Sequence, residues 1–298
     1  MVLKRSRWPR GRVLGGSSVL NYMLYIRGNR RDYDKWAEMG SYGWSWEEVL
    51  PYFIKSEDNR DPAVAGNGYH GVGGLLTVSS PTDATPISFA FPEAGKHLGY
   101  PNVDLNGPTQ TGFAIPQGTV RRGARCSTAK AFLYPVRDRS NLHIVTFAYV
   151  TKILFNEFKR AQAVQFDQFD RLTHMVYARK EIIISGGSVN TAQLLMLSGI
   201  GPRGHLEALG IPVVADLPVG LNLQDHIYPG GVHFTFEGKY SFVERRIVSF
   251  RNLISYFASG RGKWSISSLS LFISIIYLRL HRSIHHIWRR RRLKFYQH

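Results

Sequence analysis

The sequence predicts a mixed α/β fold in which short helices and strands alternate with glycine-rich turns. Two windows, 32–38 and 45–55, show the apolar spacing of a helix, whereas 142–155 is rich in β-branched and aromatic residues. With 44% hydrophobic residues among 298, the chain can bury one substantial core or two modest ones. We therefore expect a globular, turn-rich protein.

The first elements follow a glycine turn near the N-terminus. Residues 15–18 read Gly-Gly-Ser-Ser, and the nearly continuous apolar and aromatic run at 19–27 predicts a buried segment after the turn. Two short helices are expected next, at 32–38 and 45–55. Ser45 is a suitable N-cap for the second helix.

A hairpin and a third helix are expected after these two helices. Glycines alternate with apolar residues over 66–80, and two of them precede the apolar run at 75–78, which predicts a hairpin. The helix expected at 87–98 ends at Gly99, with Pro101 beyond it.

The second half of the chain predicts a β-meander followed by an α/β unit. The meander strands are expected at 142–155, 161–169 and 175–178. Three isoleucines after Glu181 predict a buried strand at 181–184, and after a glycine turn a helix is expected at 191–197. A strand, a turn and a helix in this order are typical of a parallel sheet.

The net charge of +17 would indicate nucleic acid or an anionic membrane surface if it were spread over one face. Instead, about half of the excess lies in 263–298, which has no acidic residue. No recognition fold accompanies it, so no nucleic-acid partner is expected. The apolar run at 265–278 is shorter than the roughly 20 residues that cross a bilayer, so no membrane span is expected.

Other compositional features narrow the possibilities. The basic residues at 1–10 precede no apolar segment, so they do not form a secretory signal peptide. Cys126 is the single cysteine, which excludes an internal disulfide. No zinc-binding spacing of Cys and His occurs, so no metal is expected. These features do not indicate a cellular compartment.

One glycine motif is misleading. Residues 66–71 satisfy G-x-G-x-x-G, but the dinucleotide fingerprint follows a strand and opens a helix. Polar residues precede this one and a second glycine pair follows it, so we reject the nucleotide interpretation. His70, His97 and His226 are interpreted as structural, because none has a recognisable nucleophile as its partner.

Two longer motifs carry most of the functional information. The first, 11–21 (GRVLGGSSVLN), continues through Tyr25, Gly28 and Asp34; the second is 187–202 (GSVNTAQLLMLSGIGP). A Gly-Gly-Ser-Ser turn alone is usually an ordinary turn. Together and in this order, the motifs resemble the two signatures of the glucose–methanol–choline oxidoreductases. Ala192 departs from the Pro or Ser usual in that family.

The resemblance extends over about 7–262 and implies the fold, the cofactor and the reaction. It implies a partial FAD-binding domain interleaved with a partial antiparallel-sheet substrate domain. The reaction would be oxidation of a small alcohol or sugar by hydride transfer to the flavin of FAD. The segments expected from the resemblance are 1–75 and 136–226 for FAD binding, 76–135 and 227–262 for the substrate domain, and 263–298 as a basic tail outside the family pattern.

Matching motif positions imply five cofactor-binding residues. These are Gly15, Ser17 and Asn21 against the pyrophosphate and flavin ring, Leu24 through its backbone at the ring, and Val150 through its backbone at the adenine. From the residues alone, an ordinary core valine in a strand is an equally good interpretation of Val150. No catalytic residue is assigned, because the family supplies its catalytic histidine from a segment that this sequence does not match.

The resemblance leaves alternatives open. Relatives begin with a glycine-rich βαβ unit that this sequence does not match, so we expect an incomplete enzyme, inactive as written. A non-catalytic remnant or gene-model fragment is the second hypothesis, and a basic tail that binds anionic partners is the third. Because codons for 262–264 can contain the consensus start of an intron, one hypothesis is that the tail is translated intron sequence.

Overall fold

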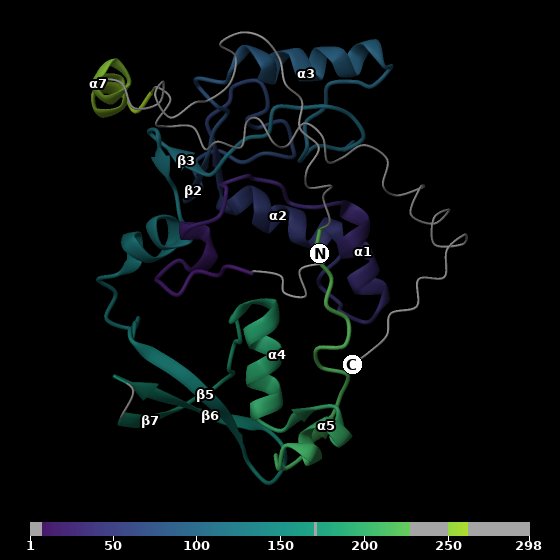
Figure 1. Ribbon diagram of the computed structural model, residues 1–298, viewed down its shortest axis with the longest axis vertical. Coiled ribbons are helices and arrows are strands. Elements are labelled where there is room, and N and C mark those ends of the chain that lie inside the picture. Colours follow the sequence, from purple (N-terminus) through teal and green to yellow (C-terminus); the bar gives the residue numbers. More distant parts are fainter. Residues whose placement is uncertain (1–7, 170–171, 227–249, 262–298) are drawn as a thin grey trace, which may run out of the picture. The chain divides into compact units, whose positions relative to one another are not determined.

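The computed structural model describes residues 8–169, 172–226 and 250–261. These residues form two compact units, which are described separately: the first contains 8–142 with 250–261, and the second contains 143–226. Of the segments expected from the sequence, 263–298 and most of 227–262 lie outside the described residues. The structure confirms a mixed α/β fold of helices and small sheets (Figure 1).

Three of the four α-helices described in the first unit lie where the sequence predicts them, and the last was not predicted. The four are α1 (Arg30–Glu38), α2 (Trp46–Ser56), α3 (Pro86–His97) and α7 (Phe250–Ser259). Ser45 and Glu48 form a capping box at the start of α2, which confirms the predicted N-cap. The rings of Tyr33, Trp46 and Phe53 pack together between α1 and α2, which gives this part of the unit its core.

Strands of the first unit are short. β1 (Glu57–Asn59) pairs with β2 (Leu76–Val78) in parallel, and β3 (Val120–Arg121) pairs with β4 (Ala124–Arg125) as an antiparallel hairpin. Three single-turn helices complete the unit: η1 (Gly16–Val19), η2 (Ala129–Leu133) and η3 (Tyr134–Val136). No helix follows the G-x-G-x-x-G sequence at 66–71, as expected.

The hairpin predicted within 66–80 is wrong. β2 pairs with β1, which lies before the glycine-rich segment, and a parallel pair needs a long connection rather than a tight turn. Gly71 and Gly74 permit this arrangement, because a Cβ on either would lie 2.0 Å and 2.4 Å, respectively, from a backbone oxygen of residues 54–57. The glycines therefore let two backbones pack closely and do not form a hairpin turn.

The second unit contains the predicted meander. Strands β5 (Ala148–Phe155), β6 (Ala161–Gln168) and β7 (Leu172–Tyr177) form an antiparallel sheet. The helix α4 (Gly187–Leu197) packs beside β5 (Figure 1). Residue Ser198, just after α4, accepts a hydrogen bond at Oγ from the backbone N–H of Ile153 at 2.9 Å, which joins the helix end to the sheet.

A small parallel pair ends the second unit. β8 (Ile200–Gly201) and β9 (Ala215–Asp216) are parallel and are connected through α5 (Arg203–Ala208). The strand predicted at 181–184 is wrong, because these residues form no strand and Ile183 is 79% exposed. No neighbouring strand among the described residues supplies the hydrogen bonds that a strand requires. An apolar run alone does not determine its pairing partner.

Candidate functional site

The glycine turn of the first motif adopts a backbone that glycine favours. Gly15 and Gly16 have φ of 93° and 54°, in the left-handed region. A Cβ on Gly15 would lie 3.2 Å from the Cβ of Ala129, so that side of the turn packs closely. A Cβ on Gly16 would meet no atom of the described residues within 4 Å. The turn therefore packs against Ala129 at Gly15 and is open at Gly16, where a ligand could approach the backbone closely.

Residues 125–128 hold the turn in place. The hydroxyl of Ser18 donates to the carbonyl of Gly15 at 2.5 Å and accepts from the backbone N–H of Thr128 at 3.0 Å. A guanidinium nitrogen of Arg125 donates to the Ser18 carbonyl at 3.0 Å and to Oδ1 of Asn21 at 2.9 Å. Long-range hydrogen bonds thus define both the turn and the position of the Asn21 side chain.

The polar side chains expected at the site are exposed. Oδ1 of Asn21 also accepts from the backbone N–H of Met23 at 3.0 Å, so both of its described hydrogen bonds use the oxygen and the amide nitrogen can face a ligand. Ser17 is exposed, and its hydroxyl accepts from the backbone N–H of Gly11 at 3.2 Å. Its own O–H proton is therefore available to an acceptor.

The backbone of Leu24 is also oriented away from its neighbouring segment. Leu24 forms an antiparallel bridge with Gly118, but the two hydrogen bonds of this bridge use other groups. The backbone N–H of Thr119 donates to Met23 at 2.8 Å, and that of Tyr25 donates to Gln117 at 3.0 Å. In such a pair the N–H and C=O of the central residue point outward. The main chain of Leu24 is therefore free of hydrogen bonds to the segment around Gly118.

Apolar side chains around the turn are exposed, which corrects the prediction that 19–27 is buried throughout. Of that run only Arg27 is buried. Exposed apolar side chains beside a turn can pack against an aromatic ring system. At this turn they are Val13, Leu14, Val19, Leu20 and Tyr22, with exposed fractions of 58%, 46%, 37%, 49% and 67%. The residues present at this turn thus fit a flavin.

A buried network of charges lies behind the segment that follows the turn. Arg27 donates to Glu57 at 2.7 Å, and both side chains are almost completely buried. Glu57 also contacts Nδ1 of His70 at 2.8 Å, and Nε2 of His70 contacts Asp104 at 2.9 Å. Burial lowers the pKa of His70, but hydrogen bonds to Asp104 and Glu57 outweigh it and raise the pKa to about 9. Positive and negative charges therefore alternate along the network.

This network continues into the backbone of the same segment. The backbone N–H of Arg27 donates to Oδ1 of Asn106 at 2.8 Å, while Nδ2 of Asn106 donates to the carbonyl of Tyr25 at 2.9 Å. Asn59 connects Glu57 at 3.0 Å to the side chain of Gln117 at 2.9 Å. The network thus fixes the segment that carries Leu24. The sequence analysis assigned no role to this network.

Four of the five predicted site residues lie in the first unit. Val150 lies in the second unit, on β5, where it pairs with Phe166 and is 39% exposed. Sequence analysis missed Arg125 and Thr128 as supports of the turn, because they lie more than 100 residues away in the chain and outside both motifs. The only available signal was that both residues lie within 7–262, over which the family resemblance extends.

Comparisons with known proteins identify the class of the fold and site. The GMC oxidoreductase family model matches residues 3–228. Glucose dehydrogenase [FAD, quinone] of Drosophila melanogaster is 48% identical over 227 residues, which are 75% of this chain and 36% of the relative. Mitochondrial choline dehydrogenase of Homo sapiens is 45% identical over 222 residues, 74% of this chain and 36% of the relative.

Solved structures agree with this class. Pyridoxine 4-oxidase from Mesorbium loti matches with a TM-score of 0.65 at 35% identity, over 71% of this chain and 41% of that one. An FAD-dependent oxidoreductase from Chaetomium thermophilum matches with a TM-score of 0.71 at 31% identity, over 87% of this chain and 47% of that one. The chain spans less than half the length of each of these relatives.

The chain belongs to the GMC oxidoreductase family. The family match and the flavoprotein structures indicate FAD as its cofactor. Among the described residues, no helix has the length and apolarity to cross a membrane. The same residues contain no group of three or more His, Cys, Asp or Glu side chains placed to hold a metal ion.

Proposed function

We propose that this chain is part of an FAD-dependent oxidoreductase that acts on CH–OH groups of a small alcohol or sugar. Family membership supports the reaction class, and the names of its relatives, glucose dehydrogenase and choline dehydrogenase, support the substrate class. The observation that carries the proposal is the first-motif turn, supported from behind by Ala129 and open in front of Gly16.

The proposed site places five residues of the first unit along the flavin. Gly15 and Gly16 allow its close approach, while the hydroxyl of Ser17 and the amide of Asn21 supply hydrogen-bond donors. The backbone of Leu24 faces the ring system. Val150 is proposed to meet the adenine through its backbone.

FAD, when bound, supplies a hydride acceptor for the carbon of the alcohol. The residues of this chain bind and orient: Arg125 holds Asn21 and the turn, and the exposed apolar side chains around the turn exclude water from the ring. We assign no catalytic residue. The chain as written is proposed to bind FAD without oxidising an alcohol.

Substitution of Gly16 by Asn tests the proposal. Asn tolerates a positive φ, and its side chain enters space that no described protein atom occupies, so G16N is expected to fold normally and to block the flavin. Gly66→Asn is the matched control, because Gly66 has φ of 74° and also has nothing within 4 Å of its Cβ. Flavin absorbance after purification with added FAD measures binding, and circular dichroism measures folding.

Two comparisons decide the outcome. Retention of FAD by the wild type and by G66N, with loss of at least tenfold in affinity by G16N, would support the site. Equal FAD binding by G16N and the wild type would contradict it, and loss in G66N alone would favour the rejected dinucleotide motif at 66–71. Alcohol-dependent dye reduction by the wild-type chain would contradict the proposed lack of turnover.

A further inference from the structure

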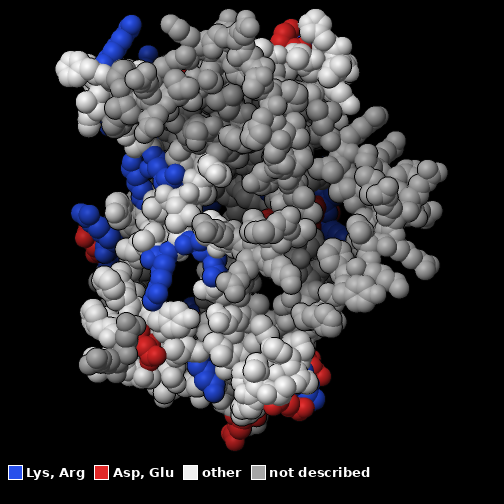
Figure 2. Space-filling model, viewed as in Figure 1, with Lys and Arg blue, Asp and Glu red and all other residues white. Residues whose placement is uncertain are grey.

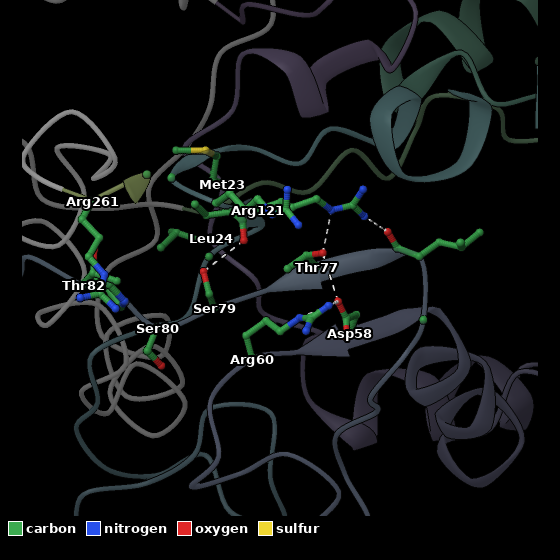
Figure 3. Close-up of a pocket in the computed structure, with 18 of the residues that line it drawn as sticks. Met23, Leu24, Asp58, Arg60, Thr77, Ser79, Ser80, Thr82, Arg121 and Arg261 are labelled. Atoms are coloured by element: carbon green, nitrogen blue, oxygen red, sulfur yellow. Dashed lines mark hydrogen bonds and ion pairs between the residues drawn. The ribbon is translucent and has the colours of Figure 1, made fainter. Parts of the chain in front are cut away.

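A pocket of about 760 Å³ lies in the first unit, beside the segment that carries Leu24 (Figure 3). Its walls come from β2, the β3–β4 hairpin and the residues that follow α7. The volume falls within the range of about 300–1,000 Å³ that is typical of small-molecule sites. Tyr22 and Leu24 belong to this lining and also to the proposed flavin site, but neither the flavin proposal nor the family motifs assign a ligand to the arginines of the pocket.

Four arginines are among the described residues that line the pocket, and one of them forms an ion pair. Arg60 forms an ion pair with Asp58 at 2.6 Å, which Figure 3 shows at the lower side of the pocket. The other three, Arg121, Arg122 and Arg261, form no ion pair with any described carboxylate. Asp58 is the single acidic residue among the described lining residues, which therefore carry an excess of positive charge.

Arg121 is already oriented by neutral oxygens. Its Nε donates to the hydroxyl of Thr77 at 2.8 Å, and one terminal nitrogen donates to the carbonyl of Leu75. Neither acceptor cancels the guanidinium charge, and the second terminal nitrogen donates to no described residue. A planar guanidinium held in this way is suited to bind a carboxylate or a phosphate.

Close backbone packing brings the other two arginines to the same place. A Cβ on Gly123, at the hairpin tip, would lie 2.0 Å from the carbonyl oxygen of Gly260. This approach places Arg122 and Arg261, the residues next to these glycines, in one lining. In Figure 2, blue side chains gather over the part of the molecule where Figure 1 shows β3.

We propose that this pocket binds a small organic anion, a carboxylate or a phosphate ester, through Arg121, Arg122 and Arg261. The three arginines that form no ion pair with a described carboxylate supply the attraction, and Met23, Leu24 and Ser79 are among the other described residues of the lining. This anion would be a ligand other than the flavin, and its binding can be measured without FAD.

Titration calorimetry on the full chain tests the proposal with four probes. Glucose is the neutral probe, gluconate tests a carboxylate, and glucose 6-phosphate and inorganic phosphate test a phosphate. Gluconate or glucose 6-phosphate is expected to bind at least tenfold more tightly than glucose, and its affinity should fall with added salt. Tighter binding of gluconate would identify a carboxylate site, whereas tighter binding of either phosphate would identify a phosphate site.

Charge-neutralising variants locate the binding. R121Q and R122Q are each expected to weaken anion binding about tenfold, as for loss of a hydrogen bond to a charged group. R122Q removes none of the described hydrogen bonds, so it remains informative if R121Q folds poorly. R31Q is the matched control, because Arg31 lies on α1, outside the pocket lining, and is in no described ion pair.

Three results would overturn the proposal. The first is equal binding of glucose and the anions by the wild type, and the second is equal loss of anion binding in R31Q and R122Q. The third concerns G16N, which is expected to lose FAD and to keep the anion. Parallel loss of both ligands in G16N and R122Q would make the pocket part of the flavin site. Failure of the flavin proposal alone would leave anion binding intact.

Discussion

Replacement of Glu57 by Gln is expected to destabilise the first unit strongly. The carboxylate of Glu57 is completely buried and accepts hydrogen bonds from Arg27 at 2.7 Å, from Asn59 at 3.0 Å and from the backbone N–H of Gly71 at 2.9 Å. Gln keeps the shape but removes the charge, so the buried guanidinium of Arg27 loses its ionic partner. Breaking a buried pair from one side costs about 3–5 kcal/mol.

A matched variant separates burial from pairing. Glu93 forms an ion pair with Lys96 at 2.8 Å, but its side chain is 59% exposed. Because exposed pairs contribute about 0–1 kcal/mol, E93Q is expected to change the free energy of unfolding by less than about 1 kcal/mol. The two substitutions remove the same charge from the same residue type, and they differ in burial.

Urea unfolding followed by tryptophan fluorescence measures the difference. Four of the six tryptophans lie among the described residues, all in the first unit, and their contribution to the signal reports its unfolding; they are Trp8, Trp36, Trp44 and Trp46. The free energy of unfolding of E57Q is expected to fall by at least about 3 kcal/mol relative to E93Q. An equal effect of the two substitutions would refute the argument that the buried network stabilises this unit.

Three further predictions concern stability. Folding raises the pKa of His70 from 6.5 to about 9. The contribution of the protonated imidazole to the free energy of unfolding is therefore complete below pH 6.5 and is lost as the pH rises through 9. Urea titrations should show this decline in the wild type and not in H70Q. Gly71→Ala is expected to lower the melting temperature, since its Cβ would meet a backbone oxygen at 2.0 Å. The control Gly204→Ala, whose Cβ meets no described atom within 4 Å, should instead stabilise its helix by about 0.5–1 kcal/mol. Ser198→Ala leaves the buried N–H of Ile153 without its acceptor and should lower the free energy of unfolding, followed by circular dichroism, by about 1–3 kcal/mol. A decrease as small as that for an exposed serine would contradict the importance of this hydrogen bond.

Features that depend on neighbouring residues were determined by the sequence itself. The helices α1, α2 and α3 follow from apolar spacing and caps, because a helix forms its hydrogen bonds within one segment. The meander follows from β-rich runs separated by turns, since each of its strands pairs with the next one in the chain. The motif at 11–21 likewise identified the glycine turn and its family.

Features that join distant residues were decided by tertiary structure. The parallel pairing of Glu57 with Leu76, the buried contacts among Arg27, Glu57 and His70, and the arginine pocket have no local pattern. A strand can form its hydrogen bonds with any suitable edge, and a buried charge can be neutralised by a residue far away in the chain. Sequence spacing therefore indicated where the elements lie, whereas packing determined which of them meet.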